Sequence, residues 1–190
     1  IISLAITITF FAGIFYFNLN DLMSSEGEQV VYSNEHYTLR GKPAELQKDL
    51  FKDLTAQLDQ DLEYDMDAIE LVVKSFIADY YTWSNKVGTY DIGGKDFIFA
   101  NEFTNFNFTS RRYIYKTMSN FLAKEIAKKD LNEVSEIRVL SVNYATEYDY
   151  YGTMYPAYYI EAEWDYIPNE LIDLTMFPKW GAFTVVKLES

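Results

Sequence analysis

The spacing of apolar residues predicts three helices between residues 43 and 126. Leucines recur every four residues from Leu46 to Leu62, directly after Pro43, and place one apolar stripe along a helix. The next stretch begins with a variant of the capping box at Asp67 and continues with a broad apolar face. A third helix is expected to start near Thr109 or Ser110. Its inward residues are Ile114, Met118, Phe121, Leu122 and Ile126.

Beyond Ser135 the apolar period becomes alternating, which predicts antiparallel strands. After a turn near Tyr151-Gly152, apolar and acidic side chains alternate through residues 158 to 166, as in a strand with one buried face. A last strand is expected in "GAFTVVKLES". For the first strand, simple alternation puts Arg138, Leu140, Val142 and Tyr144 on one face and Ile137, Val139, Ser141 and Asn143 on the other. For the second, it buries Tyr158, Ile160, Ala162, Trp164 and Tyr166 and leaves Tyr159, Glu161, Glu163 and Asp165 on the open face.

Helices followed by a strand meander predict an α+β fold in which helices pack on a curved antiparallel sheet. We divide the chain into a transmembrane anchor at 1–18, a polar stalk at 19–42 and an α+β domain at 43–190. The order of these parts, more than any single motif, defines the predicted architecture.

The anchor prediction rests on "IISLAITITFFAGIFYF", which has no charged residue. As a helix it would rise about 26 Å, against a hydrocarbon core of about 30 Å. A signal-peptide core and a buried helix are the alternatives. The following residues 18–29 are acidic and contain no lysine or arginine, which favours a main domain outside the cytoplasm. The expected location is therefore the cell membrane, with a single membrane pass.

Charge and composition disfavour some classes of binding partner and some kinds of catalytic site. The formal net charge of −13 disfavours a broad basic face for nucleic acid or anionic lipid. The absence of cysteine excludes a thiol nucleophile, and no glycine-rich phosphate loop with a following lysine is present. The expected partners are other membrane or envelope proteins, and the membrane itself through the N-terminal helix.

A helix with "FIADYYTW", a loop with "YDIGG", a third helix and long aromatic-rich strands together resemble the nuclear transport factor 2-like superfamily. Those proteins form a cystatin-like α+β cone, in which a curved sheet is wrapped by helices. In its membrane-anchored form the chain is similar to extracytoplasmic scaffold subunits of bacterial secretion and conjugation systems. The resemblance covers about residues 67–190 and rests on the order of elements, so it transfers no functional residue.

Candidate chemistry in the sequence is sparse. The acidic stretch "DQDLEYDMD" at 59–67 has Tyr64 where a calcium loop needs glycine, so we expect no metal site. The only histidine, His36, lies in the predicted stalk, away from the cone. Packing accounts for the tyrosines without chemistry. The candidate acids are Asp79, Asp149 and Asp165, and the candidate proton donors are Tyr80, Tyr81, Tyr144 and Tyr158.

We therefore expect a non-enzymatic, membrane-anchored interaction or scaffold domain of a cell-envelope complex, without a cofactor. The alternative is a small-ligand or glycan-binding receptor domain that uses a tyrosine-lined cone mouth, and a third hypothesis is a weak hydrolase or isomerase. A filled cone favours the scaffold, and an open cone favours the ligand. The expected interaction surface comprises Tyr148, Tyr150, Tyr151, Tyr155 and Tyr159.

Overall fold

The computed structural model describes residues 32–34, 37–58 and 66–186. The predicted anchor at 1–18, His36 and residues 59–65 lie outside the described residues. Within the ranges that the structure describes, no helix combines the length and the apolar character needed to cross a bilayer.

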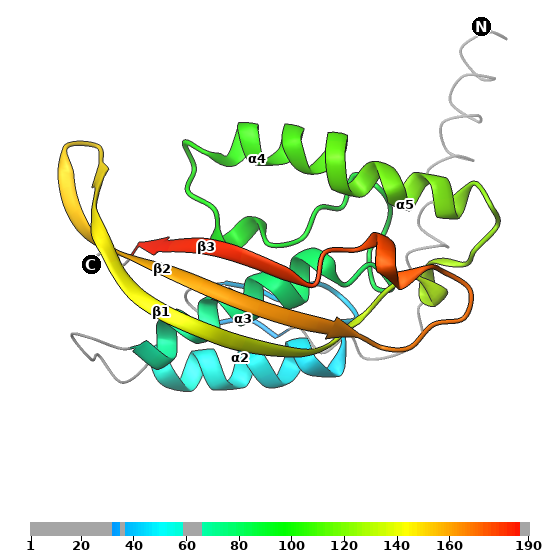
Figure 1. The fold of residues 1–190 in the computed structure, drawn as a ribbon, viewed down its shortest axis with the longest axis horizontal. Helices are drawn as coiled ribbons and strands as arrows, with labels where there is room; N and C mark the ends of the chain where they lie inside the picture. Colours follow the sequence, from blue (N-terminus) through cyan, green and yellow to red (C-terminus); the bar gives the residue numbers. More distant parts are fainter. Residues whose placement is uncertain (1–31, 35–36, 59–65, 187–190) are drawn as a thin grey trace, which may run out of the picture. The chain divides into compact units, whose positions relative to one another are not determined.

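The described chain is α+β, as predicted, with helices packed against a three-stranded antiparallel sheet (Figure 1). The strand order is β1-β2-β3. The strands are β1 (Val134–Tyr150), β2 (Thr153–Tyr166) and β3 (Trp180–Val186). The α-helices are α2 (Glu45–Leu58), α3 (Met66–Tyr81), α4 (Phe103–Thr109) and α5 (Tyr115–Leu122). Short helical turns are η1 (Lys95–Phe97), the π-helical η2 (Ser110–Ile114), η3 (Lys128–Asp130) and η4 (Leu174–Met176).

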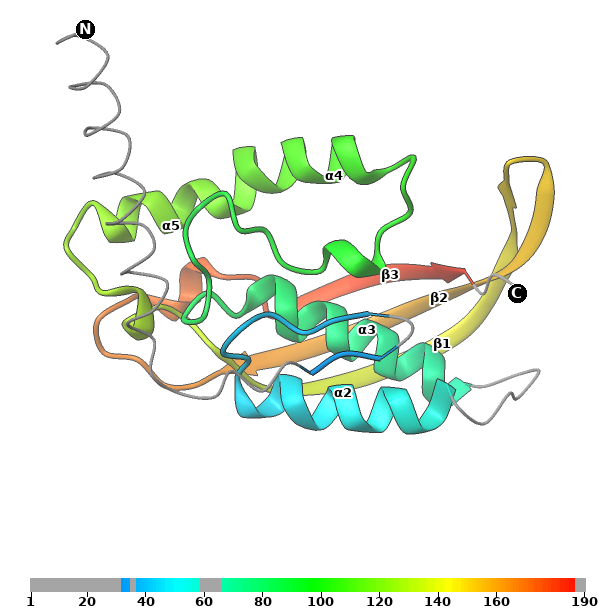
Figure 2. The same cartoon turned by 180° about the vertical axis from the view of Figure 1, so that it is seen from behind.

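The apolar stripes of the first two helices are buried as the spacing predicts. In α2, Leu50 and Leu54 are buried, and α2 packs against α3. In α3, Ile69, Val73 and Ile77 are buried, and this helix lies along the sheet, as the views from both sides show (Figures 1 and 2). Helix α3 is therefore the central element, with the sheet on one side and α2 on another.

The segment just before α2 belongs to the folded domain. Tyr37 is buried against Phe51 and Leu54 of α2, and the backbone N–H of Leu39 donates to the Tyr32 carbonyl at 2.8 Å. Residues 37–42 fall in the range assigned to the stalk. Tyr37 is buried and Tyr32 and Leu39 are partly buried against α2, so the domain begins upstream of residue 43.

The third helix begins earlier than predicted. It starts with α4 at Phe103, continues through the π turn η2 and ends with α5 at Leu122. Helix α4 buries no residue completely, so its sequence lacks the apolar period that would reveal it. The π turn directs both Ser110 and Tyr115, five residues apart, into the interior, because a π turn advances by more residues than an α turn.

In β2 the predicted faces are confirmed. The apolar residues from Tyr158 to Tyr166 are buried at alternate positions, and Glu161, Glu163 and Asp165 lie between them on the open face. In β1 the predicted simple alternation is wrong beyond Val139. A bulge between Val139 and Ser141 changes the phase, because two β1 residues there face one residue of β2. As a result Val139, Val142 and Tyr144 pair with Ala162, Ile160 and Tyr158 on the inner face, and Arg138, Ser141 and Asn143 lie on the outer face.

The turn between β1 and β2 is where the sequence places it. Tyr150 pairs with Thr153, so the loop has two residues, Tyr151 and Gly152. Their φ angles are 53° and 86°, as a type I′ hairpin turn requires at both positions. The Gly152 N–H donates to Asp149 Oδ1 at 2.7 Å and closes the turn.

The space between the sheet and the helices is filled by large side chains. Trp164 of β2 stacks on Tyr81 of α3 with ring centroids 4.6 Å apart, and Trp83 contacts Phe177 edge-on at 5.1 Å. Tyr115 and Met118 enter the same core from the η2–α5 side. Side chains therefore fill the space between the sheet and the helices, as in other close-packed protein cores.

Candidate functional site

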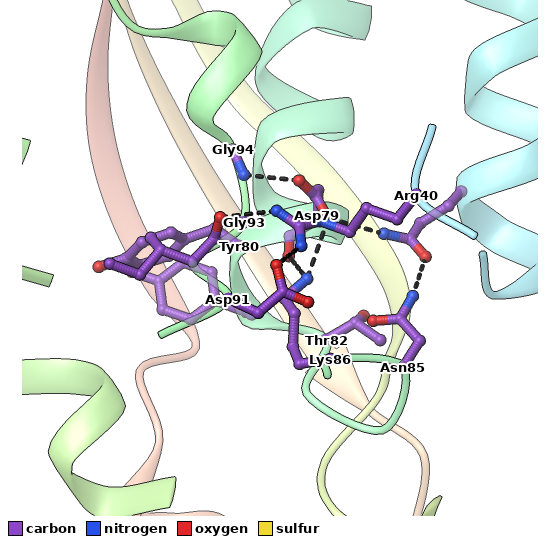
Figure 3. Close-up of polar contacts among 12 residues, drawn as sticks. Arg40, Asp79, Tyr80, Thr82, Asn85, Lys86, Asp91, Gly93 and Gly94 are labelled. Carbon is purple, nitrogen blue, oxygen red and sulfur yellow. Dashed lines mark hydrogen bonds and ion pairs between the residues drawn. The ribbon is translucent and has the colours of Figure 1, made fainter. Parts of the chain in front are cut away.

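Four charged side chains from three segments meet in one cluster (Figure 3). Arg40 comes from the segment before α2, Asp79 from the last turn of α3, and Lys86 and Asp91 from the loop after α3. The Lys86 side chain has no exposed surface, although lysine is almost never fully buried without a partner. We call Arg40, Asp79, Lys86 and Asp91 the charge cluster.

Asp79 is the centre of the charge cluster and both of its oxygens are occupied. Oδ1 accepts hydrogen bonds from Arg40 Nε at 2.8 Å and Lys86 Nζ at 2.9 Å, with Gln47 Nε2 at 3.3 Å. Oδ2 accepts from the backbone N–H of Gly94 at 2.6 Å. This one carboxylate therefore ties α3 to α2, to the segment before α2 and to the following loop.

The arginine spans the cluster. Its Nη1 contacts Asp91 Oδ1, and its Nη2 donates to the Ile92 carbonyl at 2.6 Å. The other Asp91 oxygen, Oδ2, accepts from the Val87 N–H at 2.9 Å. Two cations thus face two anions, so the cluster is balanced in charge, which is the condition for a buried ionic group to persist.

Two glycines let the loop approach α3 this closely. A Cβ on Gly93 would lie 2.0 Å from the Asp79 carbonyl oxygen, so only glycine fits. Gly94 has a φ of 72°, in the left-handed region that glycine adopts without strain. The glycine pair that the sequence marks as a helix breaker therefore also delivers an N–H to Asp79.

The cluster shifts the ionisation of its members. Burial raises the pKa of the Asp79 carboxyl, but the positive charges of Lys86 and Arg40 and the Gly94 N–H outweigh burial, so the net pKa lies below its ordinary value. For Lys86, burial is the largest effect and attraction to Asp79 opposes it only in part, so the pKa falls from 10.5 to about 8. At pH 7 both groups are charged.

We expect the Lys86 pKa to make stability rise with pH above about 8. Between about 8 and 10.5 the unfolded chain keeps the lysine proton while the folded chain has lost it. The unfolded state then binds more protons, so the free energy of unfolding increases with pH, by about 1 to 2 kcal/mol between pH 7.5 and 9.5. Urea unfolding at several pH values measures this slope.

The matched control is Lys86→Met, which keeps the buried stem and removes the titrating amine. Its free energy of unfolding should lack the rise between pH 7.5 and 9.5, even if the variant is less stable throughout. Above pH 10 the buried tyrosines act in the opposite sense, since burial raises the pKa of Tyr166 and of Tyr81. Equal slopes for the parent protein and Lys86→Met would contradict the assignment.

The geometry of the charge cluster is that of a structural ion-pair network more than that of a catalytic site. A carboxylate whose pKa is lowered and whose oxygens accept four hydrogen bonds is a weak proton acceptor. A cavity beside it, lined by Tyr37, Ser75 and Asp79 among others, has a volume of about 20 Å³. That space accommodates a single water molecule, not an organic substrate.

The structure does not bring the three candidate acids together. Asp149 closes the hairpin turn, and Asp165 lies on the outer sheet face, where Arg138 Nη2 donates to it at 2.8 Å. Hydrogen bonds from Arg138 and Lys179 lower the pKa of Asp165. Within the described residues, no group of three or more acidic or histidine side chains is arranged to hold a metal ion.

The four candidate tyrosines have packing roles or face solvent. The Tyr80 hydroxyl donates to Ser110 Oγ at 2.9 Å inside the core. Tyr81 stacks on Trp164, and Tyr158 is buried beneath the sheet. Tyr144 is exposed and meets Tyr158 edge-on with centroids 5.9 Å apart. None of these four tyrosines lines the small cavity beside Asp79.

The five tyrosines of the expected interaction surface all lie on the β1–β2 hairpin and the adjoining part of β2. Tyr151 at the tip and Tyr159 on the outer face are exposed. Tyr148, Tyr150 and Tyr155 are half-buried. The ring of Phe99, from the loop before α4, lies against the rings of Tyr148 and Tyr150, with centroids 5.8 and 4.8 Å apart. This contact supports the hairpin just below its tip.

A second surface feature lies between α3 and β3. A space of about 280 Å³, open to solvent on one side, is enclosed by Val72, Val73 and Phe76 of α3, by Phe97 at the end of η1 and the following Ile98, and by residues 182–185 of β3. We call it the β3 groove. Its lining is apolar except for Thr184, and it has no charged side chain.

Sequence reasoning identified Asp79 as a candidate acid but missed its partners. Arg40 was assigned to the stalk, and Lys86 stood in a loop with no sign of burial. The available signal was the pair Gly93-Gly94, since glycines that allow close backbone approach often mark a place where another segment packs. Nothing in the periodicity connects residue 40 with residue 79.

Comparison with known proteins gives no relative for this chain. No protein-family model, no curated protein and no solved structure matches it. Its function is therefore inferred from the geometry of the described residues.

Proposed function

We propose that this chain is a non-enzymatic interaction domain, held at a membrane by residues 1–18 and displayed outside the cytoplasm as a scaffold or accessory subunit of an envelope complex. The observation that carries the proposal is the exposed apolar surface of the β1–β2 hairpin. The hairpin continues past the ends of α2 and α3 in both views (Figures 1 and 2).

The exposed side chains of the hairpin are those that protein interfaces favour. Tyr144, Tyr151, Met154 and Tyr159 are 60%, 79%, 53% and 39% exposed. We call these four residues the hairpin patch. Tyrosine and methionine are enriched in interfaces because they bury a large area, and the tyrosine hydroxyl still finds a polar partner. Tyr144 lies on the inner face and Tyr159 on the outer face, so the hairpin patch extends around the hairpin and is not confined to one side of it.

The hairpin is also held firmly enough to serve as a docking element. Its turn is closed by Asp149, its strands pair from Tyr144 and Tyr158 to the tip with one register shift between Tyr144 and Thr146, and Phe99 contacts one side. A preorganised surface loses less conformational entropy on binding than a mobile one does. Both properties support a protein-binding role.

The filled interior supports an interaction domain over a receptor for a small ligand. Ligand pockets usually enclose about 300 to 1,000 Å³ and carry a few polar groups that orient the ligand. The β3 groove is smaller, at about 280 Å³, and Thr184 is its one polar lining residue. Because the β3 groove is concave, a small-ligand receptor is the second candidate function. Its apolar lining offers few hydrogen-bonding groups for a glycan.

Copurification of the full-length protein in mild detergent tests the proposal. We expect stoichiometric membrane or envelope partners with the parent protein and their loss from the double variant Tyr151→Ser/Met154→Ser, because both changes remove apolar contact area from the hairpin patch. Mass spectrometry and band intensity give the partner ratio.

The matched control is Leu171→Ser/Met176→Ser. These two residues are equally apolar and exposed but lie in the connection between β2 and β3. The control should retain its partners. A full-length protein that runs as a monodisperse monomer without partners, or a hairpin variant that binds as well as the control, would refute the proposed function.

A further inference from the structure

The two edges of the sheet differ in their protection against pairing with another strand. The β1 edge is interrupted by three register shifts and carries charged residues such as Glu136, Arg138 and Glu147. In β3, the sequence "WGAFTVV" has no charge and no proline, and its pairing with β2 is regular throughout. Proteins usually protect a sheet edge with bulges, charges, proline or a covering element. Strand β3 has none of the first three.

The register identifies which main-chain groups of β3 face outward. The Trp164 N–H donates to the Lys179 carbonyl at 2.9 Å, which makes these residues a hydrogen-bonded pair. Antiparallel pairing then alternates, so Gly181, Phe183 and Val185 direct their N–H and C=O groups to β2. Trp180, Ala182, Thr184 and Val186 direct theirs away from the sheet. Over the described ranges, no backbone hydrogen bond outside the sheet involves these four residues.

The β3 groove lies beside this open edge. Its floor includes the half-buried side chains of Phe183 and Val185, and its walls are Val72 and Phe76 of α3 on one side and Phe97 and Ile98 on another. A strand added to β3 would place every second side chain on the inner face, over this apolar space. An extended segment could use both features. Its main chain would pair with the outward N–H and C=O groups of β3, and its alternate side chains would enter the apolar recess.

We propose that the outer edge of β3 pairs with an extended segment of a partner protein, whose apolar side chains at alternate positions fill the β3 groove. The inference rests on the proposed function, since it names the chemistry of a partner segment. Phe97 at the end of η1 and the following Ile98 wall the groove, so the segment contacts these two residues as well as β3. The groove has no charged side chain, so the inward residues of the segment are uncharged.

The probe is a soluble peptide of alternating threonine and valine with lysine at each end, titrated into the full-length protein in detergent with NMR detection of backbone amides. We expect the amide signals of Ala182 and Thr184 to shift and those of the hairpin patch to stay. Two further peptides carry N-methyl groups on the valines only or on the threonines only. One of the two should lose binding, because alternate residues of a strand present their N–H groups to the same edge.

The protein variant is Ala182→Pro, which removes an outward N–H at a position where an edge strand tolerates proline. It should bind the unmodified peptide about tenfold more weakly or worse. The control is Ala182→Ser, which keeps the N–H and should bind as the parent does. If Ala182→Pro does not fold, the methylated peptides on the parent protein give the same test.

Equal binding of both methylated peptides, or shifts confined to the hairpin patch, would overturn the inference. So would a homodimer, seen by analytical ultracentrifugation, whose β3 amides are protected from hydrogen exchange, since a second copy would then occupy the edge. If peptide binding fails while partners still copurify through the hairpin patch, the β3 inference falls and the proposed function stands. If the full-length parent protein copurifies with no partner but the peptide still binds β3, the proposed function falls and the β3 inference stands.

Discussion

Replacing Asp79 by asparagine should lower the free energy of unfolding by about 3 to 5 kcal/mol. The side chain keeps its shape but loses its charge, so Lys86 remains without exposed surface and without its counter-ion. Breaking a buried ion pair from one side costs far more than the pair contributes, because the remaining charge has neither water nor partner. A typical domain is stable by about 5 to 15 kcal/mol, so this change threatens folding. Urea unfolding at pH 7 measures it.

Two comparisons isolate the cause. The same chemical change at Asp165, on the exposed outer face, should cost much less, because water screens its pairs with Arg138 and Lys179. The deficit of Asp79→Asn should also shrink at pH 9, since loss of the carboxylate lowers the pKa of Lys86 further and the neutral amine tolerates burial. A loss below about 1 kcal/mol at pH 7 would show that the charge cluster does not hold the domain together.

The helices that could be predicted from the sequence are those whose apolar stripes face a large partner. In α3, burial of Ile69, Val73 and Ile77 follows directly from their spacing, because the helix lies along the sheet. Helix α4 could not be placed in the same way. It contributes only Phe106 to the core, where the ring lies 5.5 Å from Tyr80, so its apolar residues carry no inward period.

The strands too could be predicted only where burial alternates regularly along the chain. Alternation is reliable in β2 because Ala162 and Trp164 face a packed interior and Glu161 and Glu163 do not. In β1 one extra residue near Leu140 reverses the faces, and a bulge is set by the curvature of the whole sheet, which no local pattern records. A prediction from period alone therefore fails at the residue where the strand bends.

The candidate site was predictable only in part. The sequence names Asp79 as a candidate acid, alongside Asp149 and Asp165, without separating it from the other two. Its cation partners come from residues 40 and 86, one in a polar segment and one in a loop, and long-range charge pairing leaves no periodic trace. The hairpin tyrosines were predicted as a surface from composition, and the structure adds that Tyr151 is exposed whereas Tyr148 rests on Phe99.

The second large effect is expected at Trp164, which lies near the C-terminal end of β2 opposite Ile137 of β1. Its side chain is 1% exposed, stacks on Tyr81 and donates from Nε1 to the Tyr166 hydroxyl at 2.9 Å. That hydroxyl in turn donates to the Pro178 carbonyl at 2.8 Å, which ties β2 to the connection before β3. Trp164→Ala therefore removes the stacking contact with α3 and the hydrogen bond to Tyr166, the residue that links β2 to the β2–β3 connection.

Trp164→Ala should therefore lower the free energy of unfolding by about 3 to 5 kcal/mol, through lost transfer energy and an unfilled cavity. The control is Trp180→Ala in β3, because Trp180 is 54% exposed on the outer face and leaves no cavity. The double variant Trp83→Phe/Trp180→Phe isolates the emission of Trp164, which should be that of an indole shielded from water. A shift of β2 by one residue would exchange its faces, expose this indole and bury Glu163 or Asp165 instead. A loss below about 1 kcal/mol with a solvated Trp164 emission would mean that the register is wrong and that the aromatic stretch is an exposed platform.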